Sequence, residues 1–471
     1  MKLSRRELVK MLGLGGAAMA AKALHADEFV ASSDALPPGC VGDPDNPRYG
    51  KFLYDIPHTI TDGPSAFLKD GKIVQPAREV PVFSTADVVV VGGGPAGFAA
   101  AVAAARTGAK VALVERYGSL GGLFTNGMVL IIVGTGVMVD GKFQLMTRGI
   151  MEEFMNRCEH FGPKVITPKP SAEKAWQPTI DPEAAKVLMD AMIAEAKVDL
   201  FFHAWGVDVI QEGNRACGVV FESKQGRQGI LAKVVIDATG DGDMYHAAGA
   251  DYRQVSHAAG TVFRMGGMDQ IDRALAAQQK DAPFALNSNE PNGASLWGNP
   301  DLGPKTDALS VRDLTFAEVE NRKGLWKYAK KMMTTPGWEK TYLQGVASQL
   351  GVRASRLLKA ETIISRADAF AHKTYEDAIG MSGDEALFRP AFQIPYRSLL
   401  PVGVENVLAA GRCIGCAPDI IDRVRLIPVC MVTGQAAGVA AALAVKHGIT
   451  PREVDVTELR RTLEAQGARL A

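Results

Sequence analysis

A glycine-rich turn and a carboxylate that follows it are the residues whose types and spacing point most directly to chemistry. Gly92, Gly94 and Gly97 form the pattern GxGxxG, and Glu115 comes 23 residues after Gly92. The first glycine permits a tight turn, the second lets the backbone approach a pyrophosphate, and the third lets a helix pack against its strand. The N–H groups at the start of that helix attract phosphate, and the carboxylate accepts hydrogen bonds from a ribose. The pattern therefore predicts a dinucleotide site.

The elements around this turn have the order that such a site needs. Apolar runs at 88–91 and 111–114 predict buried strands, and the alanine-rich stretch between them predicts a helix. Strand, glycine turn, helix, strand and terminal acid in this order are far more specific than the glycines alone. We therefore predict an α/β fold with a Rossmann-like domain.

Farther along the chain, further segments have recognisable patterns. A helix is expected over 181–197 and a small-residue helix over 429–445, the latter packed closely on the sheet. Residues 260–390 contain polar and tryptophan-containing segments with helical stretches between them. We expect this part to form a cap inserted into the nucleotide-binding domain. Strands are expected at 199–203, 205–212, 216–223 and 228–236, with an acidic glycine turn at 237–243.

The N-terminal segment is predicted to be an export signal and not part of the folded protein. Residues 4–10 (SRRELVK) form a twin-arginine pattern, followed by a mildly apolar stretch at 11–21 and small residues suited to cleavage. An apolar run of about 11 residues is too short to span a bilayer of roughly 30 Å. We expect a periplasmic or secreted protein. An uncleaved anchor remains the alternative.

Composition excludes several classes of protein. The chain has 52 basic and 52 acidic residues, and removal of residues 1–26 leaves an excess of four acidic residues. A mildly acidic chain without a basic stripe predicts no nucleic-acid partner. No run after the leader suggests an integral membrane span. The expected parts are a signal peptide at 1–26, an extended leader at 27–84, a nucleotide-binding domain at 85–259 and 391–450, a cap at 260–390, and a tail helix at 451–471.

The cysteines do not form a metal-binding or disulfide pattern. They stand at positions 40, 158, 217, 413, 416 and 430. No repeated CxxC supports zinc or an iron–sulfur cluster, so no metal is predicted. Cys413 and Cys416 alone are locally paired, and a CxxC beside a redox cofactor could relay electrons to a dithiol.

Six blocks along the chain together resemble the FAD-dependent oxidoreductase family that includes heterodisulfide-reductase-like and fumarate-reductase-like flavoproteins. The blocks are VVVGGGPAGFAAAVAAARTGAKVALVER, SLGGLFTNG, DATGDGD, GVRASR, IPYRSLLP and NVLAAGRCIG with the helix after it. The resemblance covers about residues 85–450 and implies a glutathione-reductase-type FAD-binding domain. No second GxGxxG is found, so bound NAD(P)H is disfavoured.

The resemblance implies contacts to FAD from several blocks. The glycine turn and Glu115 would hold the ADP half. Leu123 and Thr125 would run beside the flavin, and Asp237 with Gly240 would close over the pyrophosphate. The helix after the last block would aim its positive end at the flavin. The full expected set is Gly92, Gly94, Pro95, Ala96, Gly97, Glu115, Arg116, Leu123, Thr125, Asp237, Gly240, Gly411, Arg412 and Gln435.

Hydride transfer to or from a flavin needs a cation or an acid–base group near the substrate. Arg397 and Arg425 are the favoured cations, because a bidentate arginine suits a carboxylate substrate. His257 and Tyr396 are candidate proton donors or acceptors. Each of these side chains could instead serve only to brace the structure.

The resulting hypothesis is an exported FAD-dependent oxidoreductase that acts on a small organic substrate. Dehydrogenation is favoured over reduction of a C=C bond, and electrons would pass to a protein or quinone rather than to a nicotinamide. One alternative is a thiol–disulfide oxidoreductase that uses Cys413 and Cys416. Another is a non-catalytic flavin subunit for electron transfer. The pattern does not determine the oligomeric state.

Overall fold

The computed structural model describes residues 66–279, 306–384 and 389–471. Its centre is a five-stranded parallel sheet in the order β19-β12-β4-β5-β8. Every residue of the two central strands β4 and β5 is buried, which explains their unbroken runs of apolar side chains. The strands are β4 (Val88–Val91), β5 (Val111–Val114), β8 (Asp199–Phe201), β12 (Val234–Asp237) and β19 (Val407–Ala409).

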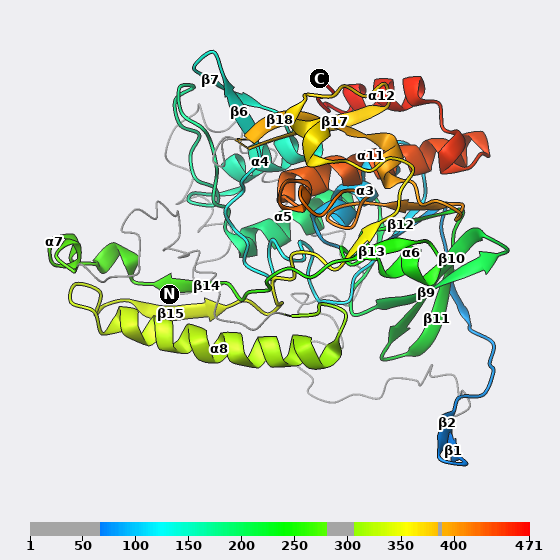
Figure 1. Ribbon diagram of the computed structural model, residues 1–471, viewed down its shortest axis with the longest axis horizontal. Helices are drawn as coiled ribbons and strands as arrows, with labels where there is room; N and C mark the ends of the chain where they lie inside the picture. The colour runs from blue at the N-terminus through cyan, green and yellow to red at the C-terminus, as the bar shows by residue number, and fades with distance from the viewer. Residues whose placement is uncertain (1–65, 280–305, 385–388) are drawn as a thin grey trace, which may run out of the picture. The chain divides into compact units, whose positions relative to one another are not determined.

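Two helices that pack on each other cover this sheet. Helix α3 (Pro95–Arg106) connects β4 to β5, and α11 (Ile427–His447) packs along it (Figure 1). A Cβ atom at Gly434 would overlap the carbonyl of Ala96, and one at Gly438 would overlap that of Ala100. The two glycines therefore bring the backbones of α3 and α11 into direct contact.

Helix α11 is also the one helix in the described chain that is long and apolar enough to cross a membrane. In this structure 94% of its most apolar window is buried inside the fold. Packing against α3 and the sheet therefore accounts for its apolar sequence. The helix begins at Ile427, before the expected start, because Pro428 occupies its first turn, where proline is well tolerated.

A second sheet, in the order β3-β11-β10-β9, lies beside the parallel sheet. The single strand expected at 228–236 is wrong, because it divides into β11 and β12, which belong to different sheets. The first strand ends at Leu231 and the second begins at Val234, and between them the Lys233 Nζ lies 2.8 Å from Asp87 Oδ1. The strands of this second sheet are β3 (Val82–Thr85), β9 (Trp205–Glu212), β10 (Arg215–Ser223) and β11 (Gly226–Leu231).

Residues 263–346 contain a smaller hydrophobic cluster of their own. Helix α8 (Val311–Met333) packs against β15 (Tyr342–Val346), which pairs with β14 (Phe263–Gly266), as Figure 1 shows. Leu325, Met332 and Trp338 form part of this cluster, and each is at most 1% exposed.

Residues near 357–379 pack instead against the main core. The expected cap at 260–390, like the other domain limits, stays a prediction. The signal peptide at 1–26 and most of the leader at 27–84 lie outside the described residues.

The remaining elements surround the sheet and its helices. Helix α12, within the expected tail, packs on α11 through Leu459 and Leu463. The other strands are β1 (Phe67–Lys69), β2 (Lys72–Val74), β6 (Gly136–Val139), β7 (Lys142–Leu145), β13 (Tyr252–Gln254), β16 (Arg356–Leu358), β17 (Ala378–Asp384) and β18 (Arg389–Pro395). The other helices are α4 (Ile150–Phe161), α5 (Pro182–Glu195), α6 (Asp243–Ala247), α7 (Arg273–Ala277), α9 (Arg366–Phe370), α10 (Ile421–Val424) and α12 (Val456–Ala465). The predicted α/β fold with a Rossmann-like parallel sheet is confirmed.

Candidate functional site

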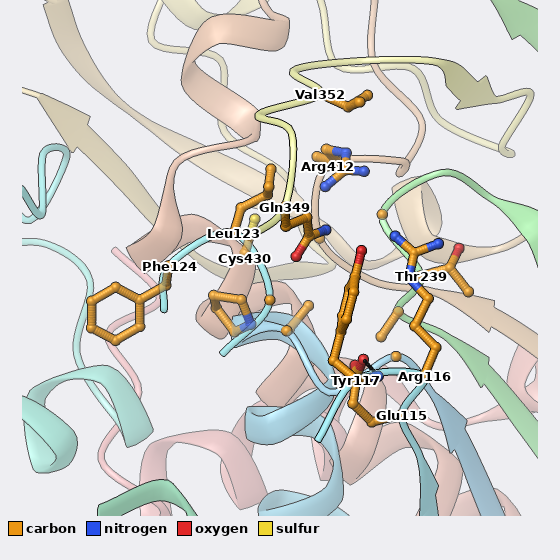
Figure 2. Close-up of a pocket in the computed structure, with 18 of the residues that line it drawn as sticks. Glu115, Arg116, Tyr117, Leu123, Phe124, Thr239, Gln349, Val352, Arg412 and Cys430 are labelled. Atoms are coloured by element: carbon orange, nitrogen blue, oxygen red, sulfur yellow. Dashed lines mark hydrogen bonds between the residues drawn. The ribbon is translucent and has the colours of Figure 1, made fainter. Parts of the chain in front are cut away.

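A large pocket lies at the carboxyl ends of the parallel strands, where open α/β sheets bind ligands. The starts of α3 and α11 both line it, through Pro95 and Ala96 of α3 and Ile427 and Cys430 of α11. Its lining extends from Glu115 and Tyr117 to Leu123, Phe124 and Cys430 (Figure 2).

The glycine turn has the geometry that its sequence predicts. Gly92 has a φ of 100°, and a Cβ there would contact the carbonyl of Ala238 on the neighbouring strand. A Cβ at Gly97 would overlap the carbonyl of Gly92, so only glycine lets α3 pack this closely. Gly94 lines the pocket, and a Cβ added to it would meet no other atom within 4 Å. The space beside Gly94 is therefore open on the pocket side.

The start of α3 also lacks a capping side chain. Its N-cap residue, Gly94, makes no side-chain hydrogen bond to the first turn. The free N–H groups and the positive end of the helix dipole therefore favour an anion at this position.

Glu115 closes the same end of the pocket. Its Oε2 accepts a hydrogen bond of 2.6 Å from the Gly93 amide, and its Oε1 accepts one of 2.7 Å from the Tyr117 amide. Burial raises the pKa of the Glu115 carboxyl, although these two amides oppose the shift. The side chain is 5% exposed, so its orientation is set before any ligand arrives.

Two aromatic residues that the sequence analysis missed stand beside Glu115. The Arg116 guanidinium lies 4.9 Å from the centroid of the Tyr117 ring and 5.9 Å from that of Trp205. All three side chains line the pocket, and Figure 2 shows Glu115, Arg116 and Tyr117 together at one side. Tyr117 directly follows the predicted Glu115–Arg116 pair, so its place at the pocket could have been predicted from the sequence. Trp205 lies about 90 residues later in the sequence and comes close to Glu115 only because the chain passes back through β8 beside β5. Local spacing therefore could not predict it.

The acidic glycine turn after β12 is held by its own backbone. Asp237 is fully buried, and its carboxylate accepts bonds from the Thr239 hydroxyl and from the amides of Thr239, Met244 and Tyr245. It therefore shapes the turn from behind and does not line the pocket. Gly240, at a φ of 75°, lines the pocket as expected.

A buried ion pair joins this turn to the glycine turn after β19. Arg412 Nη2 lies 2.8 Å from Asp241 Oδ1, which also accepts a bond of 2.7 Å from Ser355. Burial raises the pKa of the Asp241 carboxyl, but Arg412 and Ser355 outweigh it and hold the pKa below its ordinary value. Arg412 and Gly411 line the pocket, and the Nε of Arg412 is buried without a hydrogen-bond partner among the described residues.

The other side of the pocket is more apolar. Leu123, Phe124 and Cys430 lie there, and Gln349 lies between them and the Glu115 side (Figure 2). The Oε1 atom of Gln349 is buried and has no hydrogen-bond partner in the described structure. This oxygen is therefore available to a donor on a bound ligand.

Gln349 belongs to a short segment, 349–353, that we call the roof loop. The Asn126 carbonyl accepts hydrogen bonds from the amides of Ser348 and Gln349, so the roof loop is tied to the glycine-punctuated loop at 119–127. Val352 and Arg353 of the roof loop also line the pocket. The block at 351–356 is recognisable in the sequence, but Gln349 just before it was not predicted, because a single glutamine has no pattern of its own.

Two predicted catalytic residues come together at this side. Arg425 lines the pocket and bonds Asp422 Oδ1 through Nη2 at 2.6 Å and through Nε at 3.0 Å. The same oxygen lies 3.2 Å from His257 Nε2. His257 does not line the pocket itself, and its buried Nδ1 has no hydrogen-bond partner in the part of the chain that the structure describes. Asp422, which the sequence analysis missed, therefore connects the two.

Other predicted residues lie outside the pocket. The Thr125 hydroxyl donates to the Leu120 carbonyl at 2.6 Å, so it braces its own loop. Gln435 is 2% exposed, accepts a bond from the Ile150 amide and donates to the Gln466 carbonyl, which joins α11 to α4 and to the end of α12. Gly97 also lies behind the pocket wall.

Tyr396 and Arg397 are likewise placed by packing and not by the site. The Tyr396 hydroxyl is buried and donates to the Pro451 carbonyl at 2.7 Å, and burial raises its pKa. Arg397 pairs with Asp377 at 3.3 Å, and its side chain is 51% exposed. Neither residue contacts the pocket, so we do not retain them as catalytic candidates.

Cys413 and Cys416 are free thiols in this structure and do not line the pocket. Both are at most 4% exposed. Burial raises the pKa of the Cys416 thiol to about 12 and that of Cys413 well above its ordinary value. The reactive thiolate is therefore disfavoured at both positions. No group of His, Cys, Asp or Glu suited to a metal ion occurs among the described residues.

The sequence matches the family model for FAD dependent oxidoreductases over residues 87–463. The chain belongs to this family. A dihydrolipoyl dehydrogenase from Trypanosoma brucei brucei is 56% identical over 49 residues, which is 10% of each chain.

Solved structures resemble this FAD-dependent oxidoreductase at low identity. A geranylgeranyl bacteriochlorophyll reductase-like protein from Thermoplasma acidophilum is 16% identical, with a TM-score of 0.43 over 81% of this chain and 83% of its own. A flavocytochrome c3 fumarate reductase is also 16% identical, with a TM-score of 0.38 over 77% of this chain and 79% of its own.

The residues of the pocket fit FAD, the cofactor of this family. The open space beside Gly94 and the uncapped start of α3 suit a pyrophosphate. The two ends of the pocket differ as the two halves of FAD do, with Glu115 at one side and apolar side chains at the other. Gln349 offers an unpaired acceptor between them.

Gly94, which caps the start of α3, and Gly97, which lies inside α3, give a matched test of this assignment. We expect Gly94→Ala to leave the stability of the apoprotein unchanged, since its φ is −66° and the space is open. The added methyl would crowd the phosphates, and overpacking of about 1–3 kcal/mol corresponds to roughly fivefold to 150-fold weaker FAD binding. Gly97→Ala, by contrast, should lower the stability of the apoprotein itself. Thermal melting and FAD titration separate the two effects; equal melting losses in both variants would contradict the assignment.

The cysteine pair gives a second prediction. We expect the Cys413→Ala/Cys416→Ala variant to keep bound FAD and its turnover with a small-molecule donor within about twofold, because neither thiol reaches the pocket. Iodoacetamide should modify these thiols slowly in the folded protein, since burial raises their pKa. Loss of turnover with FAD still bound would restore the dithiol relay as an explanation.

Proposed function

We propose that this protein is an exported FAD-dependent oxidoreductase that exchanges a hydride with a small organic anion and passes electrons to a non-nicotinamide carrier. The observation that supports this most directly is that one pocket contains both the dinucleotide-binding turn and the Arg425 cluster. Bound FAD supplies the hydride chemistry. The chain supplies the groups that bind and orient the substrate.

Arg425 is the residue that we assign to substrate binding. Asp422 occupies its Nε and Nη2 atoms, and among the described residues its Nη1 has no hydrogen-bond partner. A guanidinium held in this way is already oriented, so less side-chain entropy is lost when it binds a carboxylate. Arg353 in the roof loop adds a second positive charge to the same lining. Together they favour an anionic substrate over a neutral alcohol or sugar.

Asp422 and His257 are positioning residues in this proposal. Asp422 holds the Arg425 guanidinium, and the His257 Nε2 atom donates to the same carboxylate oxygen. Asp422 is therefore fixed from two sides, and its pKa is held below the ordinary value by Arg425 and His257 against the effect of burial. A change at His257 should therefore act through the orientation of Arg425 rather than by direct contact with substrate.

Export and the choice of electron carrier are further parts of the proposal. The twin-arginine pattern at 4–10 supports transport of a folded protein that already contains its cofactor. The sequence has one GxGxxG turn and no second one for a bound nicotinamide. A redox protein or a quinone is therefore the expected partner. Neither of these carriers requires a second dinucleotide-binding turn in this chain.

A dye-coupled screen of carboxylic acids, alcohols and sugars with the purified holoenzyme tests the reaction. Loss of one charge-assisted hydrogen bond costs about 1.5–3 kcal/mol, so Arg425→Ala should raise KM for the best carboxylate roughly tenfold to 100-fold. Arg397→Ala is the matched control, because Arg397 is an arginine from the same prediction that lies outside the pocket. A protein without flavin absorbance, or equal effects of both variants, would overturn the proposal. Reduction only by a co-purified protein would favour an electron-transfer subunit.

Export has its own test. Replacement of Arg5 and Arg6 by lysine keeps the charge but removes the twin-arginine pattern. We expect the double variant to remain in the cytosol, while Lys10→Arg is exported normally. Cell fractionation followed by immunoblotting measures how each variant is distributed between the cytosol and the periplasm. Periplasmic recovery of the double variant in normal yield would show that the pattern is not used.

A further inference from the structure

Helix α8 has two different faces. Its inner face packs into the fold through the buried residues Ala317, Leu325 and Ala329. Its outer face leaves three large apolar side chains in solvent: Phe316 is 56% exposed, Val319 is 39% exposed and Trp326 is 54% exposed. Figure 1 shows α8 alongside β15. Apolar side chains of this size in one stripe indicate a surface that meets another apolar phase.

Basic residues alternate with these apolar ones. The outer stripe consists of Arg312, Phe316, Val319, Lys323, Trp326 and Lys330, which follow each other at steps of three or four residues and therefore share one side of the helix. The helix has six basic and three acidic residues, although the chain without residues 1–26 is acidic by four. Positive charge is therefore concentrated on α8.

The acidic residues of α8 are already engaged, whereas several basic ones are not. Glu318 pairs with Arg322 at 2.8 Å, and Glu320 pairs with Lys323 at 2.7 Å. Within the described part of the chain, Arg312, Lys327 and Lys330 form no ion pair. These three basic side chains are therefore available to an external anionic surface.

We propose that the outer face of α8 docks this protein on an anionic phospholipid surface. Amphipathic helices that lie at a membrane interface combine Trp and Phe on the apolar face with lysines beside them, and lysine stems extend along the lipid while their ammonium groups reach the head groups. Each basic residue near an anionic bilayer adds about 1 kcal/mol of attraction. The proposal does not depend on which substrate the pocket accepts.

Two other occupants fit this face less well. The centre of a protein–protein interface is depleted of lysine, whereas here lysines lie between the apolar residues. A second copy of the chain in a two-fold dimer would place the same face against itself and oppose like charges. An anionic lipid surface satisfies both the aromatic and the basic side chains.

The docked helix would also lie next to the pocket. Glu318 on α8 accepts a hydrogen bond of 3.1 Å from the Leu350 amide in the roof loop, and Ala317 packs with Leu350. The roof loop lines the pocket through Gln349, Val352 and Arg353. Lipid binding at α8 would thus bring the pocket close to the membrane surface, where a lipid-soluble electron acceptor is found.

Co-sedimentation of the purified holoenzyme with vesicles tests this proposal. We expect binding to vesicles that contain phosphatidylglycerol, little binding to pure phosphatidylcholine, and release as salt is raised. Arg312→Glu/Lys330→Glu should weaken binding at least about 100-fold, because it reverses two charges of the outer stripe. Phe316→Ser/Trp326→Ser should weaken it about tenfold or more, because the apolar contact is lost.

Val402→Ser/Lys224→Glu is the matched control, since it changes an exposed valine and an exposed lysine outside α8. The control should bind as the unchanged protein does, and all variants should keep their flavin spectrum because every altered side chain is exposed. Absence of binding to phosphatidylglycerol vesicles, or equal losses in the control, would overturn the proposal. A change from dimer to monomer in the α8 variants, without an effect on vesicle binding, would assign the face to a second copy instead.

Discussion

The contact between the backbones of α3, α11 and strand β4 is the constraint on which the rest of the structure depends. It exists because Gly97, Gly434 and Gly438 have no side chain where the neighbouring carbonyls approach. Close approach maximises dispersion contacts, which are individually small but numerous in a core of alanine and valine. Any Cβ at these positions would separate the layers and would move the helix starts that line the pocket.

This packing has an electrostatic consequence. Helix α3 and helix α11 both begin at the pocket, so two positive helix ends face the same space. The acidic turn after β12 does not oppose them with free charge, because Asp237 is bound by backbone donors and Asp241 is paired with Arg412. The pocket is therefore suited to an anionic group of its cofactor, and Arg425 adds a further positive charge to its lining.

Local patterns allowed some of these features to be predicted, and long-range packing prevented the prediction of others. The glycine turn and Glu115 were predictable because each has a steric or charge requirement within a span of 24 residues. Tyr396 and Arg397 belong to a block whose resemblance to flavoproteins suggested a role in chemistry, yet their partners are Pro451 and Asp377, which local spacing does not reveal. Such a resemblance does not separate residues that pack from residues that line the pocket.

The sequence by itself determined the parallel-sheet fold, the dinucleotide turn and the FAD-dependent family, because these depend on periodicity and on residue types that recur at fixed local spacings. Only the tertiary structure decided which polar side chains meet at the pocket. Gln349 and Arg425 reach it from segments more than 200 residues beyond the glycine turn, and Gln435 turns away from it to join three helices. Side-chain direction depends on how whole elements pack, and that information is not present in any local stretch of residues.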